Sequence, residues 1–385
     1  MNKLLIAFFL FLLPFGWIKA TASSHPESFP WKAQWINTER CQSATNTWLI
    51  YRKSFAVTNV PNQLIARIAA DSKYWLWIND QLVIFEGGLK RGPSPSGTYY
   101  DPVDIAPYLT KGSNTIAILL WHFGKDGFSH INSGKAALLF EAIAPGLEIV
   151  SDASWQCALY EAYQNTEAPF PNYRMPESNI RFDARQAITN WNRTSFEGFL
   201  PGAVCVGKAG KAPFGDLVER PIPQWKNSGL LSYVSVRESL KGDTLFCRLP
   251  YNAQITPYLK VEAEAGKTIH IRMDNYEGGS ERNVRAEYIT REGEQEYESY
   301  GWMNGHEVYY IIPEGVKVLD VKYRETGYNT DLAGSFHCDD PFYDELWQRS
   351  ARTLYITMRD KYMDCPDRER APWWGDEVNE LGEAF

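Results

Sequence analysis

The most constraining feature of this sequence is a long succession of short β-branched and aromatic segments separated by turn residues. Asn79 and Asp80 stand between two such segments, and both residue types tolerate the left-handed conformations of a tight hairpin turn. Between residues 31 and 142 the pattern predicts strands at 47–55, 64–70, 74–78, 81–85, 115–121 and 136–142. Short strands with frequent turns are typical of a β-sandwich, and we predict a lectin-like sandwich domain over residues 23–215.

A second β-rich region follows a connector that is punctuated by Pro213, Pro221 and Pro223. Its predicted strands cover residues 233–237, 259–263, 268–273, 307–312 and 316–323. We therefore predict a second β-sandwich domain over residues 216–335.

The N-terminal residues have the composition of a targeting segment. Lys3 precedes an apolar run over residues 4–18, and Ala20-Thr21-Ala22 supplies the small residues at which signal peptidase cleaves. The run is short for a membrane span, which needs about 20 apolar residues. We therefore expect residues 1–22 to be a signal peptide and the mature protein to be periplasmic or secreted, without membrane insertion.

Composition narrows the classes of partner. The formal net charge of -8 argues against nucleic acid, because nucleic-acid binding needs a basic face. Aromatic residues make up 14% of the chain, which fits either a sandwich core or a surface that stacks sugar rings, with Trp75, Trp77 and Trp121 as candidate platforms. The six cysteines form no C-x-x-C motif, so we expect no zinc site and assign no disulfide.

The hydrophobic period changes from strand to helix after Asp340. Asp340 is a suitable N-cap and Pro341 suits the first helical position. Apolar residues then recur at helical spacing as far as Met358, which predicts a helix with one buried stripe. A second helix is expected over residues 376–385.

Between these helices lies a charged, tryptophan-bearing loop, in which Pro366 and Pro372 prevent a regular helix. Its five carboxylates are Asp364, Asp367, Glu369, Asp376 and Glu377, and its arginines are Arg368 and Arg370. Clustered carboxylates can supply the acid and base pair of glycoside cleavage. A solvated salt-bridge loop and a calcium site are the alternatives, although the D-x-D-x-D spacing of a calcium loop is absent.

The run Asp364-Cys365-Pro366-Asp367-Arg368-Glu369-Arg370, followed by Trp374-Gly375-Asp376, resembles the signature of the bacterial α-L-rhamnosidases, glycoside hydrolase family 78. The residues around Trp75, and those at 285–289, 300–302 and 336–347, also resemble this family.

The resemblance implies a role for each matched residue. Glu369 would be the general acid, Asp364 and Asp376 would bind rhamnose hydroxyls, and Arg368 and Trp374 would line the same pocket. It also implies an inverting mechanism with a second Glu as general base, no metal or other cofactor, and a rhamnose-containing glycoside or polysaccharide as substrate.

The same resemblance implies a mainly β chain of two sandwich (jelly-roll) domains, followed by residues 336–385 as the start of an (α/α)6 catalytic barrel. We expect the general base to lie beyond the C-terminus, so that this chain is an N-terminal fragment and is inactive alone. Two other hypotheses stay open, namely another six-hairpin glycosidase and a non-catalytic carbohydrate-binding β-sandwich protein.

Overall fold

The computed structural model describes residues 30–89, 92–167, 175, 180–277, 282 and 284–383. Residues 32–385 form one compact unit. The predicted signal peptide at residues 1–22 lies outside the described residues.

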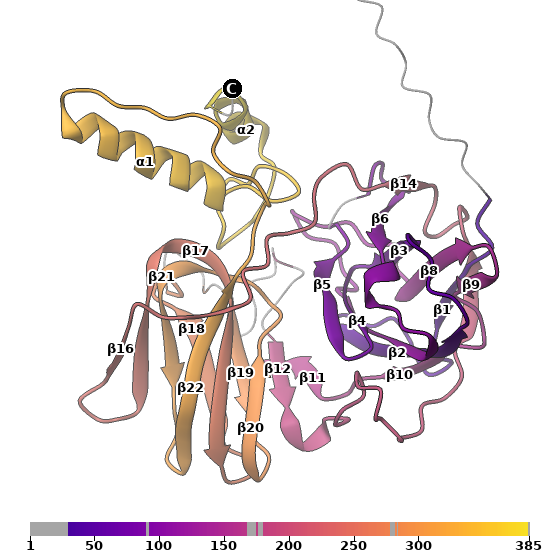
Figure 1. The fold of residues 1–385 in the computed structure, drawn as a ribbon. Coiled ribbons are helices and arrows are strands. Elements are labelled where there is room, and N and C mark those ends of the chain that lie inside the picture. Colours follow the sequence, from indigo (N-terminus) through magenta and orange to yellow (C-terminus); the bar gives the residue numbers. More distant parts are fainter. Residues whose placement is uncertain are drawn as a thin grey trace, which may run out of the picture. The chain divides into compact units, whose positions relative to one another are not determined.

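Two sheets make up the first sandwich (Figure 1). The seven-stranded sheet contains β1 (Gln34–Asn37), β3 (Ile65–Asp71), β6 (Thr98–Asp104), β8 (Ala137–Ala144), β9 (Leu147–Val150), β13 (Val204–Lys208) and β14 (Leu217–Glu219). The five-stranded sheet contains β2 (Thr47–Val57), β4 (Lys73–Ile78), β5 (Gln81–Gly87), β7 (Gly112–His122) and β10 (Gln156–Leu159). Two short 3-10 helices lie at Ala106–Tyr108 and Ala184–Gln186.

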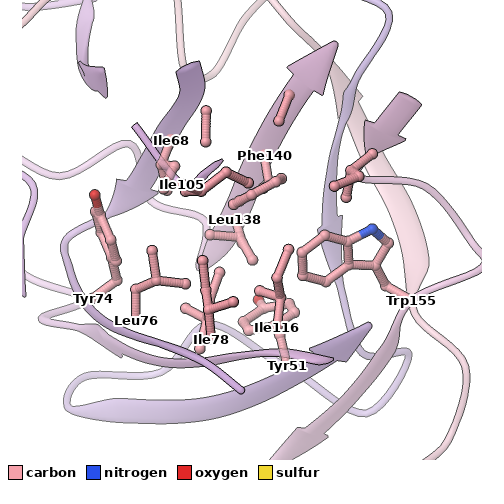
Figure 2. Packing of buried hydrophobic residues seen from close by; sticks show 14 of the residues in the cluster. Tyr51, Ile68, Tyr74, Leu76, Ile78, Ile105, Ile116, Leu138, Phe140 and Trp155 are labelled. Carbon is pink, nitrogen blue, oxygen red and sulfur yellow. The ribbon is translucent and has the colours of Figure 1, made fainter. Parts of the chain in front are cut away.

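The core of this sandwich lies between the two sheets (Figure 2). Leu76 and Ile116 of the five-stranded sheet belong to the same buried cluster as Ile68 and Leu138 of the seven-stranded sheet. All four side chains are fully buried. Burial of apolar surface at about 25 cal/mol per Å² makes this cluster a principal source of the sandwich's stability.

The predicted hairpin is confirmed, since β4 and β5 pair antiparallel and Asn79 and Asp80 have φ angles of 47° and 70°. The prediction that three tryptophans form exposed platforms for sugar rings is wrong. Trp75, Trp77 and Trp121 are 0%, 8% and 1% exposed, because they form a second core on the other face of the five-stranded sheet.

A single ten-stranded sheet forms the second β region. Its strands are β11 (Tyr163–Asn165), β12 (Ile180–Asp183), β15 (Leu230–Ser232), β16 (Ser235–Glu238), β17 (Thr244–Ala263), β18 (Thr268–Met273), β19 (Arg285–Ile289), β20 (Gly293–Glu298), β21 (Met303–Ile311) and β22 (Val316–Glu325). Figure 1 shows β18, β21, β17 and β22 side by side.

The long strand β17 departs from the sequence prediction, which placed a strand only over its last residues. The strand pairs with β16, β20, β21 and β22, and its register with β21 shifts between Arg248 and Ala253. A register shift of this kind bends a strand, so the alternation of buried and exposed residues breaks inside β17. The predicted domain limits at 215/216 and 335/336 stay predictions.

Helix α1 (Pro341–Ile356) begins where the sequence predicts. Asp340 caps it by accepting a hydrogen bond from the Phe342 N–H at 3.0 Å. Its apolar stripe is buried only at the C-terminal end, at Tyr355 and Ile356, whereas Phe342 is 62% exposed. The second helix, α2 (Trp374–Glu383), begins two residues before the predicted start at Asp376.

Across the described ranges, no helix is long and apolar enough to span a membrane, and no group of three His, Cys, Asp or Glu side chains is placed to hold a metal ion. All six cysteines are described and none forms a disulfide.

Candidate active site

The loop between the helices, residues 364–373, which we call the acid loop, is closed on itself by Asp364. The Asp364 N–H donates to the Ala371 carbonyl at 3.0 Å, and the Ala371 N–H donates to Asp364 Oδ1 at 3.0 Å. Cys365 Sγ donates to Asp364 Oδ2 at 3.1 Å. These bonds satisfy the backbone groups that the prolines leave outside helical pairing, so Asp364 fixes the base of the loop.

Arg370 fastens the acid loop to the ten-stranded sheet. Its guanidinium lies 3.4 Å from the centre of the Trp302 ring and donates to the Trp302 carbonyl at 3.1 Å. Its Nε donates to the Pro366 carbonyl at 2.7 Å, and the side chain is 1% exposed. A buried cation is stable only when its donors are paired, and these contacts make Arg370 a residue that holds the loop in place.

Asp367 is the second attachment of the acid loop to that sheet. Its Oδ2 accepts a hydrogen bond from Asn275 at 2.6 Å and a longer one from Asn304 at 3.5 Å. Burial raises the pKa of Asp367 to about 6, and nearby Asp274 acts in the same direction, against Arg370 and the two amides. Asp367 therefore keeps its proton to a higher pH than an exposed aspartate does.

Glu369 is held in a different way, by contacts within the acid loop. The indole Nε1 of Trp373 donates to Glu369 Oε2 at 2.5 Å, and Arg368 Nη2 lies 3.3 Å from Oε1. The Glu369 side chain is 13% exposed. Its carboxyl thus meets one neutral and one charged donor and stays partly exposed.

Between α1 and α2 lies an open cleft of about 460 Å³. Asp364 and Asp376, which are twelve residues apart in the sequence, both line it. The lining residues are Arg349, Ser350, Thr353, Leu354, Thr357, Asp364, Asp376 and Asn379. The cleft thus offers carboxylates, hydroxyls, an amide and a guanidinium, which are the groups that hydrogen-bond sugar hydroxyls.

The other three predicted site residues do not line this cleft. Trp374 is 83% exposed at the start of α2, and Arg368 is exposed beside Glu369. The structure therefore brings Asp364 and Asp376 together, and separately pairs Arg368 with Glu369.

The first sandwich also reaches the acid loop. The ring of Phe128 packs edge-on against Trp373 with centroids 5.3 Å apart. Just before the loop, Arg359 is 2% exposed and donates to Glu86 of β5 and to Gln254 of β17, both at 2.8 Å. A residue from each β region therefore meets the chain where the acid loop begins.

Asp367, Trp373 and Arg359 were missed as site-supporting residues by the sequence reasoning. Asp367 and Trp373 stood inside the recognised loop, but nothing in the spacing distinguishes a carboxylate that faces Asn275 from one that faces a cleft. Arg359 falls at the end of a predicted helix, and its partners are more than a hundred residues away. No local pattern signals such contacts.

Comparison with known proteins agrees with the loop's resemblance. Residues 331–384 match the family model described as the bacterial alpha-L-rhamnosidase 6 hairpin glycosidase domain. Among curated proteins, none matches by sequence.

Solved structures of similar fold cover nearly the whole chain. A family 78 rhamnosidase of Bacillus sp. GL1 matches with a TM-score of 0.81 and 18% identity, over 92% of this chain and 61% of that one. The α-L-rhamnosidase of Dictyoglumus thermophilum matches with a TM-score of 0.70 and 20% identity, over 92% and 42%. That of Streptomyces avermitilis, complexed with L-rhamnose, matches with a TM-score of 0.67 and 16% identity, over 89% and 36%.

At these identities the matches show the fold. They confirm the predicted mainly β architecture, and the chain spans less than two thirds of the length of each of these relatives.

Proposed function

We propose that this chain, whose residues 331–384 match the model of the bacterial α-L-rhamnosidase six-hairpin glycosidase domain, is the N-terminal part of a glycoside hydrolase that removes terminal α-L-rhamnose from glycosides or polysaccharides. The observation that carries the proposal is the acid loop itself. It matches the family, and the structure holds it by contacts from both β regions while the Glu369 side chain stays 13% exposed.

Glu369 is the proposed general acid. It would donate its proton to the glycosidic oxygen as the bond from that oxygen to the anomeric carbon breaks. Water would attack the anomeric carbon from the opposite face and give its proton to a second carboxylate, so that L-rhamnose leaves with inverted configuration. We place that general base outside this chain, in keeping with the 61% of the Bacillus rhamnosidase that the chain covers.

Asp364 and Asp376 are the proposed ligands of the rhamnose hydroxyls, because both line the cleft between α1 and α2. Arg368 and Trp374 are proposed to complete the pocket when sugar is bound. A flat exposed indole such as that of Trp374 can stack on the C–H face of a sugar ring, which gives it a reason to be exposed.

Export is part of the proposal, with the signal peptide at residues 1–22 and a periplasmic or secreted location. Expression with the native N-terminus, followed by intact-mass measurement of the extracytoplasmic fraction, tests it. A mature chain that begins near Ser23 supports export, and an uncleaved chain found only in the cytoplasm contradicts it.

The decisive experiment is an assay of the complete gene product with an aryl α-L-rhamnoside, with NMR to identify the first anomer released. We expect Glu369→Gln to abolish turnover. The matched control is Glu262→Gln, which changes a 59% exposed carboxylate on β17 that pairs with the exposed Lys317 at 3.5 Å. Turnover that survives Glu369→Gln would remove Glu369 as the acid, and the absence of rhamnose release would remove the function.

A panel of other aryl glycosides separates this function from that of another six-hairpin glycosidase. For the 385-residue chain alone, we expect L-rhamnose binding without turnover. Binding that is insensitive to Asp364→Asn and Asp376→Asn would favour a non-catalytic sugar-binding role for the sandwiches.

A further inference from the structure

A second pocket, which we call the arginine pocket, opens on the ten-stranded sheet and has a volume of about 300 Å³. Its lining residues are His270, Ile271, Arg272, Tyr276, Glu277, Arg282, Arg285 and Ile311. Three arginines line this pocket, of which Arg272 pairs with Glu277 and Arg285 with the buried Glu287. Guanidinium groups that cluster around a pocket attract an anion.

Arg272 is held in place without all of its donors being used. Its guanidinium lies 5.2 Å from the centre of the Tyr276 ring, and its Nη1 lies 3.3 Å from Glu277 Oε1. Its Nε is buried and has no hydrogen-bond partner among the described residues. A buried donor without a partner costs free energy, and an anionic ligand would recover that cost with a charge-assisted hydrogen bond.

One wall of the arginine pocket is formed by Arg285, whose guanidinium is held by an ion pair. Arg285 is 7% exposed, and its Nη2 lies 3.0 Å from Glu287 Oε1. Burial lowers the pKa of the neighbouring His270, and Arg285 and Arg181 act in the same direction against Glu287. The imidazole is therefore neutral near pH 7, and can donate and accept hydrogen bonds as a sugar hydroxyl requires.

The arginine pocket adjoins the segment that holds the acid loop. Asn275, which binds Asp367, immediately precedes Tyr276 and Glu277, which line the pocket. The pocket and an attachment of the acid loop therefore share one segment of the chain.

We propose that the arginine pocket binds the carboxylate or sulfate of an anionic sugar unit that neighbours the rhamnose to be removed. This inference rests on the proposed function and narrows its substrate class to acidic glycans. Arginine suits the role because its planar fork of N–H donors matches a carboxylate or sulfate in bidentate geometry. The pocket volume lies at the lower end of the range for small-ligand sites, roughly 300 to 1,000 Å³.

The test is an NMR titration of the full chain with D-glucuronate, O-sulfated L-rhamnose, inorganic sulfate and, as the neutral match, D-glucose. We expect at least one of the two anionic sugars to bind about tenfold more tightly than glucose, with affinity that falls as salt is added. Arg272→Gln and the exposed Arg282→Gln should each abolish that preference. The control Arg237→Gln changes a 63% exposed arginine that pairs with Glu307 on the same sheet, and should leave the preference unchanged.

Equal binding of the anionic sugars and glucose, binding of sulfate alone, or equal effects of Arg272→Gln and Arg237→Gln would each overturn the inference. A parallel titration with L-rhamnose separates this failure from failure of the proposed function. If the anionic sugars fail while L-rhamnose still binds and Asp376→Asn weakens it, only the arginine pocket is refuted.

Discussion

The sharpest prediction concerns Asp367→Asn, which should stabilise the fold above about pH 6. The pKa of Asp367 is raised from 3.8 to about 6 by burial, with Asp274 adding to the rise and Arg370, Asn275 and Asn304 opposing it. At about 1.4 kcal/mol per pKa unit, a rise of about two units destabilises the ionised folded form by about 3 kcal/mol.

The sign follows from proton binding in the two states. Between about pH 4 and pH 6 the folded chain keeps a proton that the unfolded chain has lost, so stability falls as pH rises through this window. Below it both states are protonated and the penalty is absent; above it the penalty is complete. Asparagine is neutral throughout and can still accept the hydrogen bond from Asn275.

We therefore expect the difference in unfolding free energy between Asp367→Asn and the wild type to grow from near zero at about pH 4 to about 3 kcal/mol in favour of the variant at about pH 7. Urea unfolding across this range measures it, and hydrogen exchange at the Asp364 and Ala371 amides reports whether the acid loop opens first. The control is Asp339→Asn, an exposed aspartate before α1. A difference that is independent of pH, or largest in acid, would refute the reasoning.

Three further predictions concern the surroundings of the acid loop. Arg359→Leu should destabilise the chain by about 3 to 5 kcal/mol in urea unfolding, because it removes a cation that pairs, beside Lys73, with buried Glu86; an unchanged midpoint would contradict this. Trp373→Phe keeps an aromatic ring beside Phe128 but loses the N–H that binds Glu369, so kcat/KM of the complete enzyme should fall about tenfold, and a fall caused by weaker sugar binding alone would argue against an orienting role. Glu369→Gln should lower kcat by at least about a hundredfold while the chain still binds L-rhamnose, and loss of binding instead would make Glu369 a sugar ligand.

Local signals made much of the fold predictable. Strand β2, the β4–β5 hairpin and the start of α1 depend on alternation, turn residues and a cap, all of which lie within a few residues of one another. The full length of β17 could not be predicted from local signals. It depends on four partner strands and on a register shift that long-range pairing imposes.

The candidate site was predictable in its residues and not in its arrangement. The motif placed Asp364, Glu369 and Asp376 in one loop and the helix after it. The grouping of Asp364 with Asp376 depends on how α2 folds back beside α1, and the orientation of Glu369 depends on Trp373. The positions of Arg370 and Asp367 depend on Trp302 and Asn275, which lie just outside strands of a distant sheet, and the spacing of the loop does not encode these contacts.

The contacts of Arg359 bear on how such a protein can be rearranged in the laboratory. Its guanidinium unites Glu86 and Gln254, which come from different β regions, directly before the acid loop. A chimera that exchanges the first sandwich for that of another glycosidase would leave the buried Arg359 guanidinium without its Glu86 partner, unless the donor protein supplies an equivalent carboxylate. Arg359, Glu86 and Gln254 must therefore be transferred together in such a chimera, or be replaced together by an apolar cluster.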